Sequence, residues 1–174
     1  MPVEPITTYL EMREAQVPAV TAPHRSGMLL QIGEPAPAFY RYLCGQLGGP
    51  PVEKDDEALA ARLVDDAHEV FVVYLGGVPA AMFELDRRTP GEVEIGRFGV
   101  LDGFGGRGLD RYVAASAIEA AWAHRPQRVW AAARAADDPH RILMLQWAGF
   151  VPYRTIRETP PGDGQPAADR GSSS

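Results

Sequence analysis

The residues best suited to chemistry in this sequence are four glycines within a segment of eight residues. Glycines leave backbone N–H groups unshielded, and a helix that begins behind them adds the positive end of its dipole. Such a turn favours a phosphate or pyrophosphate group. Asp110, at the end of the segment, places a carboxylate where an anionic ligand would sit. The segment reads Gly103-Phe104-Gly105-Gly106-Arg107-Gly108-Leu109-Asp110.

Other reactive side chains offer less. Cys44 is the single cysteine, which excludes an intrachain disulfide and fits a reducing compartment, and we interpret it as a core residue. Lys54 is the only lysine, which argues against Schiff-base chemistry. The histidines show no metal-ligand spacing, so no metal site is predicted. They are His24, His68, His124 and His140.

The composition indicates one globular domain, predicted over residues 1–158, with a disordered tail at 159–174. A net charge of −6 gives no general attraction to nucleic acid or to an anionic membrane surface. No apolar run approaches the length of a membrane span, and the first residues do not resemble a secretion signal, so we expect a cytoplasmic protein. The expected partner is a small-molecule substrate, without nucleic acid or membrane, and a homodimer is compatible with the sequence.

The hydrophobic pattern predicts a mixed α/β fold. Residues 6–12 alternate with the period of a half-buried strand, and a loop is expected at 17–25. A three-stranded meander follows at 70–75, 78–86 and 92–101, with Gly76-Gly77 as a hairpin signal. The other predicted strands are 28–32, 129–135 and 150–156, and the predicted helices are 37–47, 56–67, 108–123 and 138–148.

The place of the glycine-rich segment excludes two common nucleotide sites. A Rossmann fingerprint follows the first strand of a βαβ unit and has an acidic residue about twenty positions later. Here the glycines follow a meander, and no Gly-Lys-Ser/Thr sequence accompanies them. Neither a dinucleotide fold nor a P-loop is expected.

Several segments are similar to those of one protein family. They include Glu94-Ile95-Gly96-Arg97-Phe98-Gly99-Val100-Leu101, the glycine-rich segment, Ala120-Ala121-Trp122, Arg128-Val129-Trp130 and Gly149-Phe150-Val151-Pro152-Tyr153-Arg154. Over roughly residues 6–155 the chain resembles the GNAT superfamily of N-acetyltransferases, and most closely a bacterial subgroup whose first strand is similar to residues 7–12. The resemblance implies an α/β fold with a β-meander, splayed central strands and flanking helices. It also implies acetyl transfer from acetyl-CoA to a small amine.

The resemblance implies that acetyl-CoA lies between the two splayed strands. Its pantetheine would pair with the backbone of Phe98, Gly99 and Val100, and the missing side chain of Gly99 would permit close approach. The alternative is that Gly99 only marks a bulge. The pyrophosphate would rest on the glycine-rich turn. The implied binding residues there are Gly103, Phe104, Gly105, Gly106, Arg107, Gly108 and Leu109.

Amine acetylation needs a base, and the resemblance implies Glu94, in a position where many GNAT enzymes keep a glutamate that acts through water. Glu92 and Glu84 are neighbours that could share its orientation. The alternative for each is a solvated carboxylate on a strand face.

Several family positions have changed. Only the central glycine of the turn, Gly108, is kept, and Gly105 removes a basic or amide side chain. Asp110 replaces a small residue and would oppose a pyrophosphate, unless it points outward as a cap. Leu145 and Met144 stand where the family usually has a tyrosine and often an asparagine.

Changes near the acceptor side predict an altered or absent acceptor pocket, because Gly48-Gly49-Pro50-Pro51 replaces aromatic residues. His140 is either a replacement acid or base or an exposed side chain, and Arg134 is either a new anion contact that faces the site or a surface arginine. Three functions follow: an acetyl-CoA-dependent N-acetyltransferase, a catalytically degenerate GNAT domain that binds a partner or ligand, or a CoA-independent enzyme of specialised metabolism.

Overall fold

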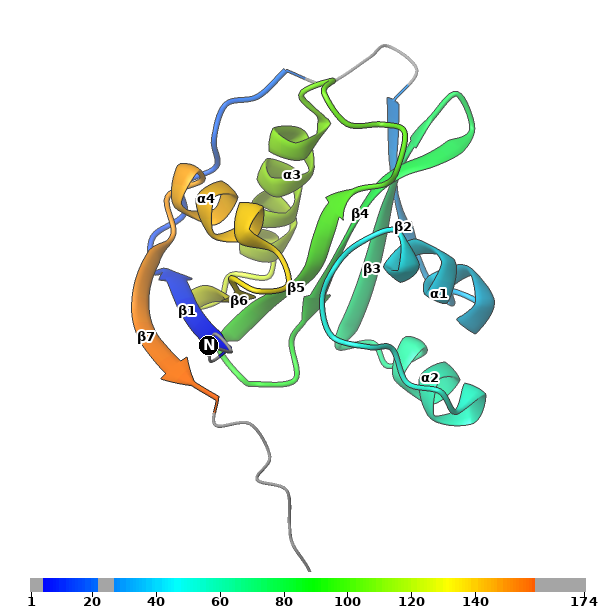
Figure 1. Ribbon diagram of the computed structural model, residues 1–174, viewed down its shortest axis with the longest axis horizontal. Coiled ribbons are helices and arrows are strands. Elements are labelled where there is room, and N and C mark those ends of the chain that lie inside the picture. Colours follow the sequence, from blue (N-terminus) through cyan, green and yellow to red (C-terminus); the bar gives the residue numbers. More distant parts are fainter. Residues whose placement is uncertain (1–4, 22–26, 159–174) are drawn as a thin grey trace, which may run out of the picture.

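The computed structural model describes residues 5–21 and 27–158 and places the strands of these residues in one seven-stranded sheet (Figure 1). The strands are β1 (Ile6–Met12), β2 (Gly27–Ile32), β3 (His68–Leu75), β4 (Val78–Asp86), β5 (Glu92–Val100), β6 (Arg128–Arg134) and β7 (Val151–Arg157). The helices are α1 (Pro37–Gly45), α2 (Asp56–Leu63), α3 (Leu109–Ala123) and α4 (Pro139–Trp147). In this described part of the chain, no helix has the length and apolar character to cross a bilayer.

The strand order β2-β3-β4-β5-β6-β1-β7 confirms the predicted mixed sheet. Neighbouring strands are antiparallel except β5 and β6, which are parallel. The β3–β4 hairpin turns at Gly76 and Gly77, whose φ values of 59° and 82° suit a two-residue turn. The β5–β6 pairing extends only from Glu92 to Glu94. Beyond Glu94 the two strands separate, which is the predicted splay.

Two hydrophobic clusters cover the two faces of the sheet. Successive strand residues point to opposite faces. Val72 and Met82 therefore pack in the cluster of α1 and α2, whereas Val73 and Phe83 pack in the cluster of α3 and α4. Burying a side chain of this size contributes about 1.5–3 kcal/mol. The clusters fix β4 and β5, and with them the strands that border the gap.

The predicted elements agree with the structure to within about two residues at each end, as at β3, which starts at His68, and the exception is the end of α2. α1 ends at Gly45, so Leu47 lies in the segment that follows it. Glycines and prolines follow closely and disfavour a longer helix. α2 ends at Leu63, because the Asp65 side chain accepts a hydrogen bond from the Ala67 amide at 2.9 Å and forms a turn. The predicted tail, 159–174, and residues 22–25 of the predicted loop lie outside the described residues.

Candidate functional site

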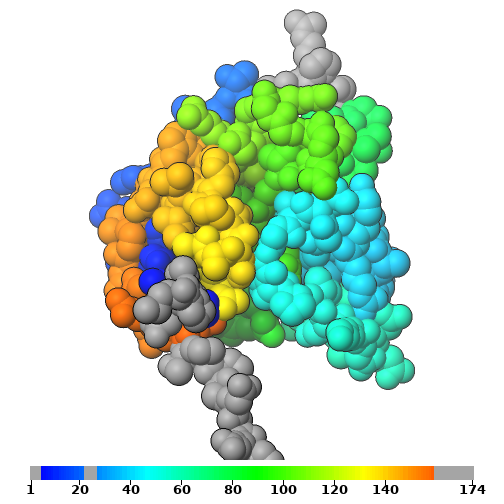
Figure 2. Space-filling view, viewed as in Figure 1, coloured from blue at the N-terminus to red at the C-terminus, as the bar shows by residue number. Residues whose placement is uncertain are grey.

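A cleft of about 650 Å³ opens where β5 and β6 separate. The segment after α1 (cyan) and α4 (yellow) face each other across it in Figure 2. The two walls approach closely at Gly48, where a Cβ would lie 3.0 Å from the carbonyl oxygen of Asp137. A cleft of this volume is in the range of small-molecule sites.

A β-bulge in β5 bends this strand away from β6. The register shifts between Phe83 and Leu85 on β4, so that Glu84 opposes two β5 residues, Gly96 and Arg97. The bulge requires glycine at position 96, because a Cβ there would lie 2.7 Å from Glu84 Cγ. The predicted splay therefore has a local cause in the sequence.

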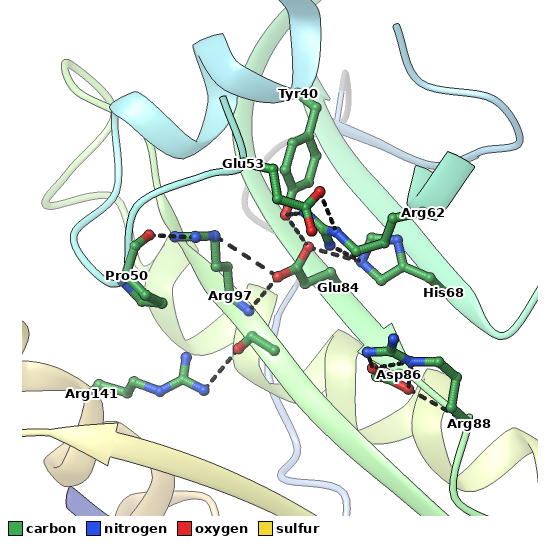
Figure 3. Close-up of polar contacts among 11 residues, drawn as sticks. Tyr40, Pro50, Glu53, Arg62, His68, Glu84, Asp86, Arg88, Arg97 and Arg141 are labelled. Carbon is green, nitrogen blue, oxygen red and sulfur yellow. Dashed lines mark hydrogen bonds and ion pairs between the residues drawn. The ribbon is translucent and has the colours of Figure 1, made fainter. Parts of the chain in front are cut away.

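The Glu84 carboxylate is the common partner of several polar groups around the bulge (Figure 3). Its Oε1 accepts a hydrogen bond from the Arg97 amide at 3.1 Å, and its Oε2 accepts one from the Tyr40 hydroxyl at 2.7 Å. His68 Nε2 lies 3.1 Å from the same Oε2. Burial disfavours the charge, but the hydrogen bonds from His68 and Tyr40 outweigh burial and lower the pKa of Glu84. Glu84 is a buried anchor of the bulge, which leaves it a poor base.

Glu94 has a different environment. It is the last β5 residue that pairs with β6, and its side chain lines the cleft. Among the described residues, no hydrogen bond or ion pair holds its carboxylate. Burial, and next the charge of Asp86, raise the pKa of Glu94 to about 7. Glu92, two residues earlier, is instead paired with Arg128 Nε at 2.9 Å.

The glycine-rich turn presents unpaired amides at the start of α3. Gly103, Gly106 and Gly108 have φ values of 88°, 77° and 72°, in the left-handed region that favours glycine. A Cβ on any of them would meet nothing within 4 Å, so they serve the backbone conformation and not packing. In the described part of the chain, the amides of Gly106 and Gly108 donate to no protein acceptor. This arrangement can hold an anion.

The Asp110 carboxylate points to α4. Its Oδ2 lies 3.6 Å from Nε2 of His140, and both residues line the cleft. It accepts no hydrogen bond from Gly106 or Gly108 within residues 27–158. The Asp110 and His140 side chains are 44% and 65% exposed, so the pair is screened by solvent. Asp110 therefore leaves the turn amides free and remains a nearby negative charge.

The strand predicted to pair with pantetheine borders the cleft. Phe98, Gly99 and Val100 all line it, and β6 no longer pairs with β5 at this point. The space beside Gly99 is filled, because a Cβ there would lie 2.9 Å from Leu47 Cδ2. The close approach that this glycine permits is therefore made by Leu47 on one face, while the backbone edge stays unpaired.

The residues considered above as proton donors or as anion contacts lie partly in the cleft and partly in the core. Met144 lines the cleft, whereas Leu145 is buried in the core, and neither carries a useful proton. His140 also lines the cleft. Of the two interpretations of Arg134, the structure agrees with the one that faces the site: Arg134 is partly exposed and lines the cleft, and its Nη2 lies 2.6 Å from Glu158 Oε2. It is the last residue of β6, and alternation places it on the sheet face opposite the core residue Ala133.

Arg141 is a cleft residue that the sequence reasoning missed. Its Nε donates to the carbonyl of Ala132 at 2.8 Å. Its Nη2 donates to the carbonyls of Ile95 and Gly96 at 3.0 and 2.7 Å. Arg141 therefore joins β5 to β6 across the gap. It lies in the first turn of a helix capped by Asp138, where a cation is disfavoured by the helix dipole, and this position was the available signal.

Comparison with known protein families shows which family this chain belongs to. The family described as acetyltransferase (GNAT) matches residues 36–150, which is more than half of the chain. The chain belongs to this family. The GNAT match includes the meander, the bulge, the glycine-rich turn and the whole of α4. A search of curated proteins finds no match.

Solved GNAT structures share the fold at low sequence identity. A GCN5-related N-acetyltransferase from Sphaerobacter thermophilus has a TM-score of 0.62 and 14% identity, over 87% of this chain and 50% of that chain. A tandem GNAT protein from the clavulanic acid biosynthesis pathway has a TM-score of 0.59 and 18% identity, over 91% of this chain and 55% of that chain. An aminoglycoside acetyltransferase from an uncultured soil metagenomic sample has a TM-score of 0.56 and 14% identity, over 71% of this chain and 88% of that chain. The chain spans about half the length of the first two structures, and at these identities the likeness concerns the fold alone.

Proposed function

We propose that the protein is an acetyl-CoA-dependent N-acetyltransferase of a small amine, with Glu94 as the base. The observation that carries this proposal is the half-buried Glu94 carboxyl, which faces the cleft where β5 leaves β6 and has a pKa of about 7. A base with a pKa near the working pH accepts protons efficiently. A small acceptor is supported by the aminoglycoside acetyltransferase among the similar structures.

The backbone offers a place for each part of acetyl-CoA. The unpaired edge of β5 from Phe98 to Val100 is suited to pantetheine, and the free amides of Gly106 and Gly108 are suited to the pyrophosphate. The thioester then lies towards the bulge and Glu94. As a substrate, acetyl-CoA supplies an activated acyl group, while the protein supplies orientation and the base.

The reaction begins with the neutral amine. Its nitrogen forms a bond to the thioester carbonyl carbon, and the π electrons of the carbonyl move to oxygen. One proton of that nitrogen passes through a water molecule to the Glu94 carboxylate. The C–S bond then breaks as the carbonyl reforms, and the CoA thiolate takes a proton from solvent.

The test is release of free thiol from acetyl-CoA with a panel of small amines. We expect kcat/KM to rise with pH around an apparent pKa of about 7, because the base must be deprotonated. Glu94→Gln should lower kcat by about 10²–10⁴. The matched control is Glu92→Gln, on the same strand but paired with Arg128. If calorimetry shows no acetyl-CoA binding and no amine releases thiol, the proposal fails.

A GNAT domain that binds a ligand without transferring acetyl groups is the second candidate. It is favoured by Met144 in the cleft and Leu145 in the core, since neither can protonate a leaving thiolate. This candidate predicts measurable binding of acetyl-CoA or another ligand with no thiol release from any amine. Turnover of one amine would exclude it.

A further inference from the structure

The bulge in β5 leaves backbone N–H and C=O groups without partners on a neighbouring strand. Two side chains, those of Glu84 and Arg141, form hydrogen bonds with these groups. Glu84 Oε1 accepts from the Arg97 amide at 3.1 Å. From the gap, Arg141 donates to the carbonyls of Ile95 and Gly96. The bulge amide would otherwise be a suitable donor to a carbonyl oxygen lying in the gap. Because Glu84 already holds it, a donor must come from elsewhere.

Arg141 has unused donor capacity. A guanidinium carries five N–H groups in one plane, and Arg141 directs three of them to backbone carbonyls of β5 and β6. Its Nη1 donates to no acceptor among the described residues, although the side chain lines the cleft. In Figure 3, Arg141 and Glu84 reach the bulge from different directions.

The charge of Arg141 is held without a direct anionic partner. No carboxylate of residues 5–21 or 27–158 lies within ion-pair distance of it. Its guanidinium carbon is 4.7 Å from the centroid of the Phe98 ring, and backbone carbonyls surround the rest. Burial lowers the pKa of Arg141 to about 10, so the group stays charged at neutral pH. A fixed, desolvated cation with free donors is suited to stabilise developing negative charge.

The direction in which acetyl-CoA would run along β5 brings its acyl group close to Arg141. The pyrophosphate position lies after β5 and the pantetheine position at its end, so the acyl end lies towards Ile95 and Gly96. Resting on the proposed function, we propose that Arg141 Nη1 donates to the thioester carbonyl oxygen and stabilises the oxyanion. The carbonyl electrons move to this oxygen as the C–N bond forms. They return as the C–S bond breaks and the thiolate leaves.

The first test compares kinetics of the full chain and its variants. Arg141→Ala should lower kcat by about 10²–10³, because one preorganised donor to an oxyanion is lost. The KM for the amine and the Kd of CoA should stay within about twofold of wild type. Methylguanidine should restore part of kcat, whereas methylammonium should not. Arg154→Ala is the matched control, because this β7 arginine is exposed and stacks on Tyr9, outside the cleft.

The second test is binding without turnover. CoA lacks the thioester carbonyl oxygen that acetyl-CoA carries. Wild type should therefore bind acetyl-CoA several-fold more tightly than CoA, and Arg141→Ala should lose this preference. If that variant does not fold, Arg141→Lys keeps the charge without the planar fork and should lower kcat by about tenfold or more. An unchanged kcat, a raised KM for the amine alone, or a retained preference overturns the proposal. A wild-type protein that releases no thiol with any amine overturns the proposed function itself, before any variant is made.

Discussion

Replacing Glu94 with glutamine should make the protein more stable at alkaline pH while it removes the proposed base. Burial raises the pKa of this carboxyl from 4.5 to about 7, so the folded state favours the neutral form. Below pH 4.5 Glu94 is protonated in both folded and unfolded chains. As the pH rises from 4.5 to 7, the unfolded chain loses this proton first, and the free energy of unfolding of wild type falls. Above about pH 7 the penalty is constant.

The size of the penalty follows from the two pKa values. A change from 4.5 to about 7, at about 1.4 kcal/mol per pH unit, sets an upper limit of about 3.5 kcal/mol. Glu94 is partly open to the cleft, so solvent screens its charge, and we expect about 1–2 kcal/mol. Glutamine cannot ionise and does not incur this penalty.

Urea denaturation at pH 5 and pH 8.5 measures the effect. The free energy of unfolding of Glu94→Gln relative to wild type should grow by about 1–2 kcal/mol between the two pH values. The control Glu92→Gln loses an ion pair with Arg128 and should be slightly less stable than wild type, without that growth. A difference between Glu94→Gln and wild type that stays the same at both pH values would refute a raised pKa.

Three further substitutions test the packing and charge of the cleft. Gly96→Ala places a Cβ 2.7 Å from Glu84 Cγ and should lower the free energy of unfolding by about 2 kcal/mol or more, measured by thermal denaturation. Asp110→Asn removes a negative charge beside the turn amides and should tighten acetyl-CoA binding about threefold to tenfold by calorimetry. Gly99→Ala brings a Cβ within 2.9 Å of Leu47 Cδ2, the end of a half-exposed side chain that can shift, and should cost about 1 kcal/mol, part of which Leu47→Ala restores in the double variant.

Matched controls accompany these substitutions. Gly33→Ala adds a Cβ that meets nothing within 4 Å, so it should leave stability near that of wild type. Asp102→Asn removes a similar charge from an exposed position just before the turn and should change acetyl-CoA affinity less than Asp110→Asn does. Full stability of Gly96→Ala, unchanged affinity of Asp110→Asn, or tolerance of Gly99→Ala with Leu47 in place would each contradict the corresponding reasoning.

Much of the fold follows from local pattern and turn chemistry. Strands 6–12 and 78–86 have their predicted bounds, because alternation and the Gly76-Gly77 turn both depend on neighbours in sequence. The early end of α2 depends on a side-chain hydrogen bond of Asp65, which competes with the helix at a position that the hydrophobic pattern does not mark.

The site was predictable in part. Glu94 and the strand from Phe98 to Val100 do line one cleft, as the resemblance implied, while their roles remain predictions. Arg141 was missed because its hydrogen-bond partners on β5 are about 45 residues away in sequence. The contact of Leu47 with Gly99 is also long-range, since it depends on how the segment after α1 folds over β5. Periodicity carries no information on either contact.

The place of β1 in the sheet bears on how the chain folds during synthesis. β1 lies between β6 and β7, and both strands come more than 100 residues later in the chain. A nascent chain that has left the ribosome only as far as α3 can form the β3–β5 meander from neighbouring segments, but β1 still lacks both partners. Such distant pairing is slow, and unpaired strand edges promote aggregation. The β6 wall of the cleft is therefore expected to form late, and a truncated chain would release an incomplete site together with a strand free to pair with other chains.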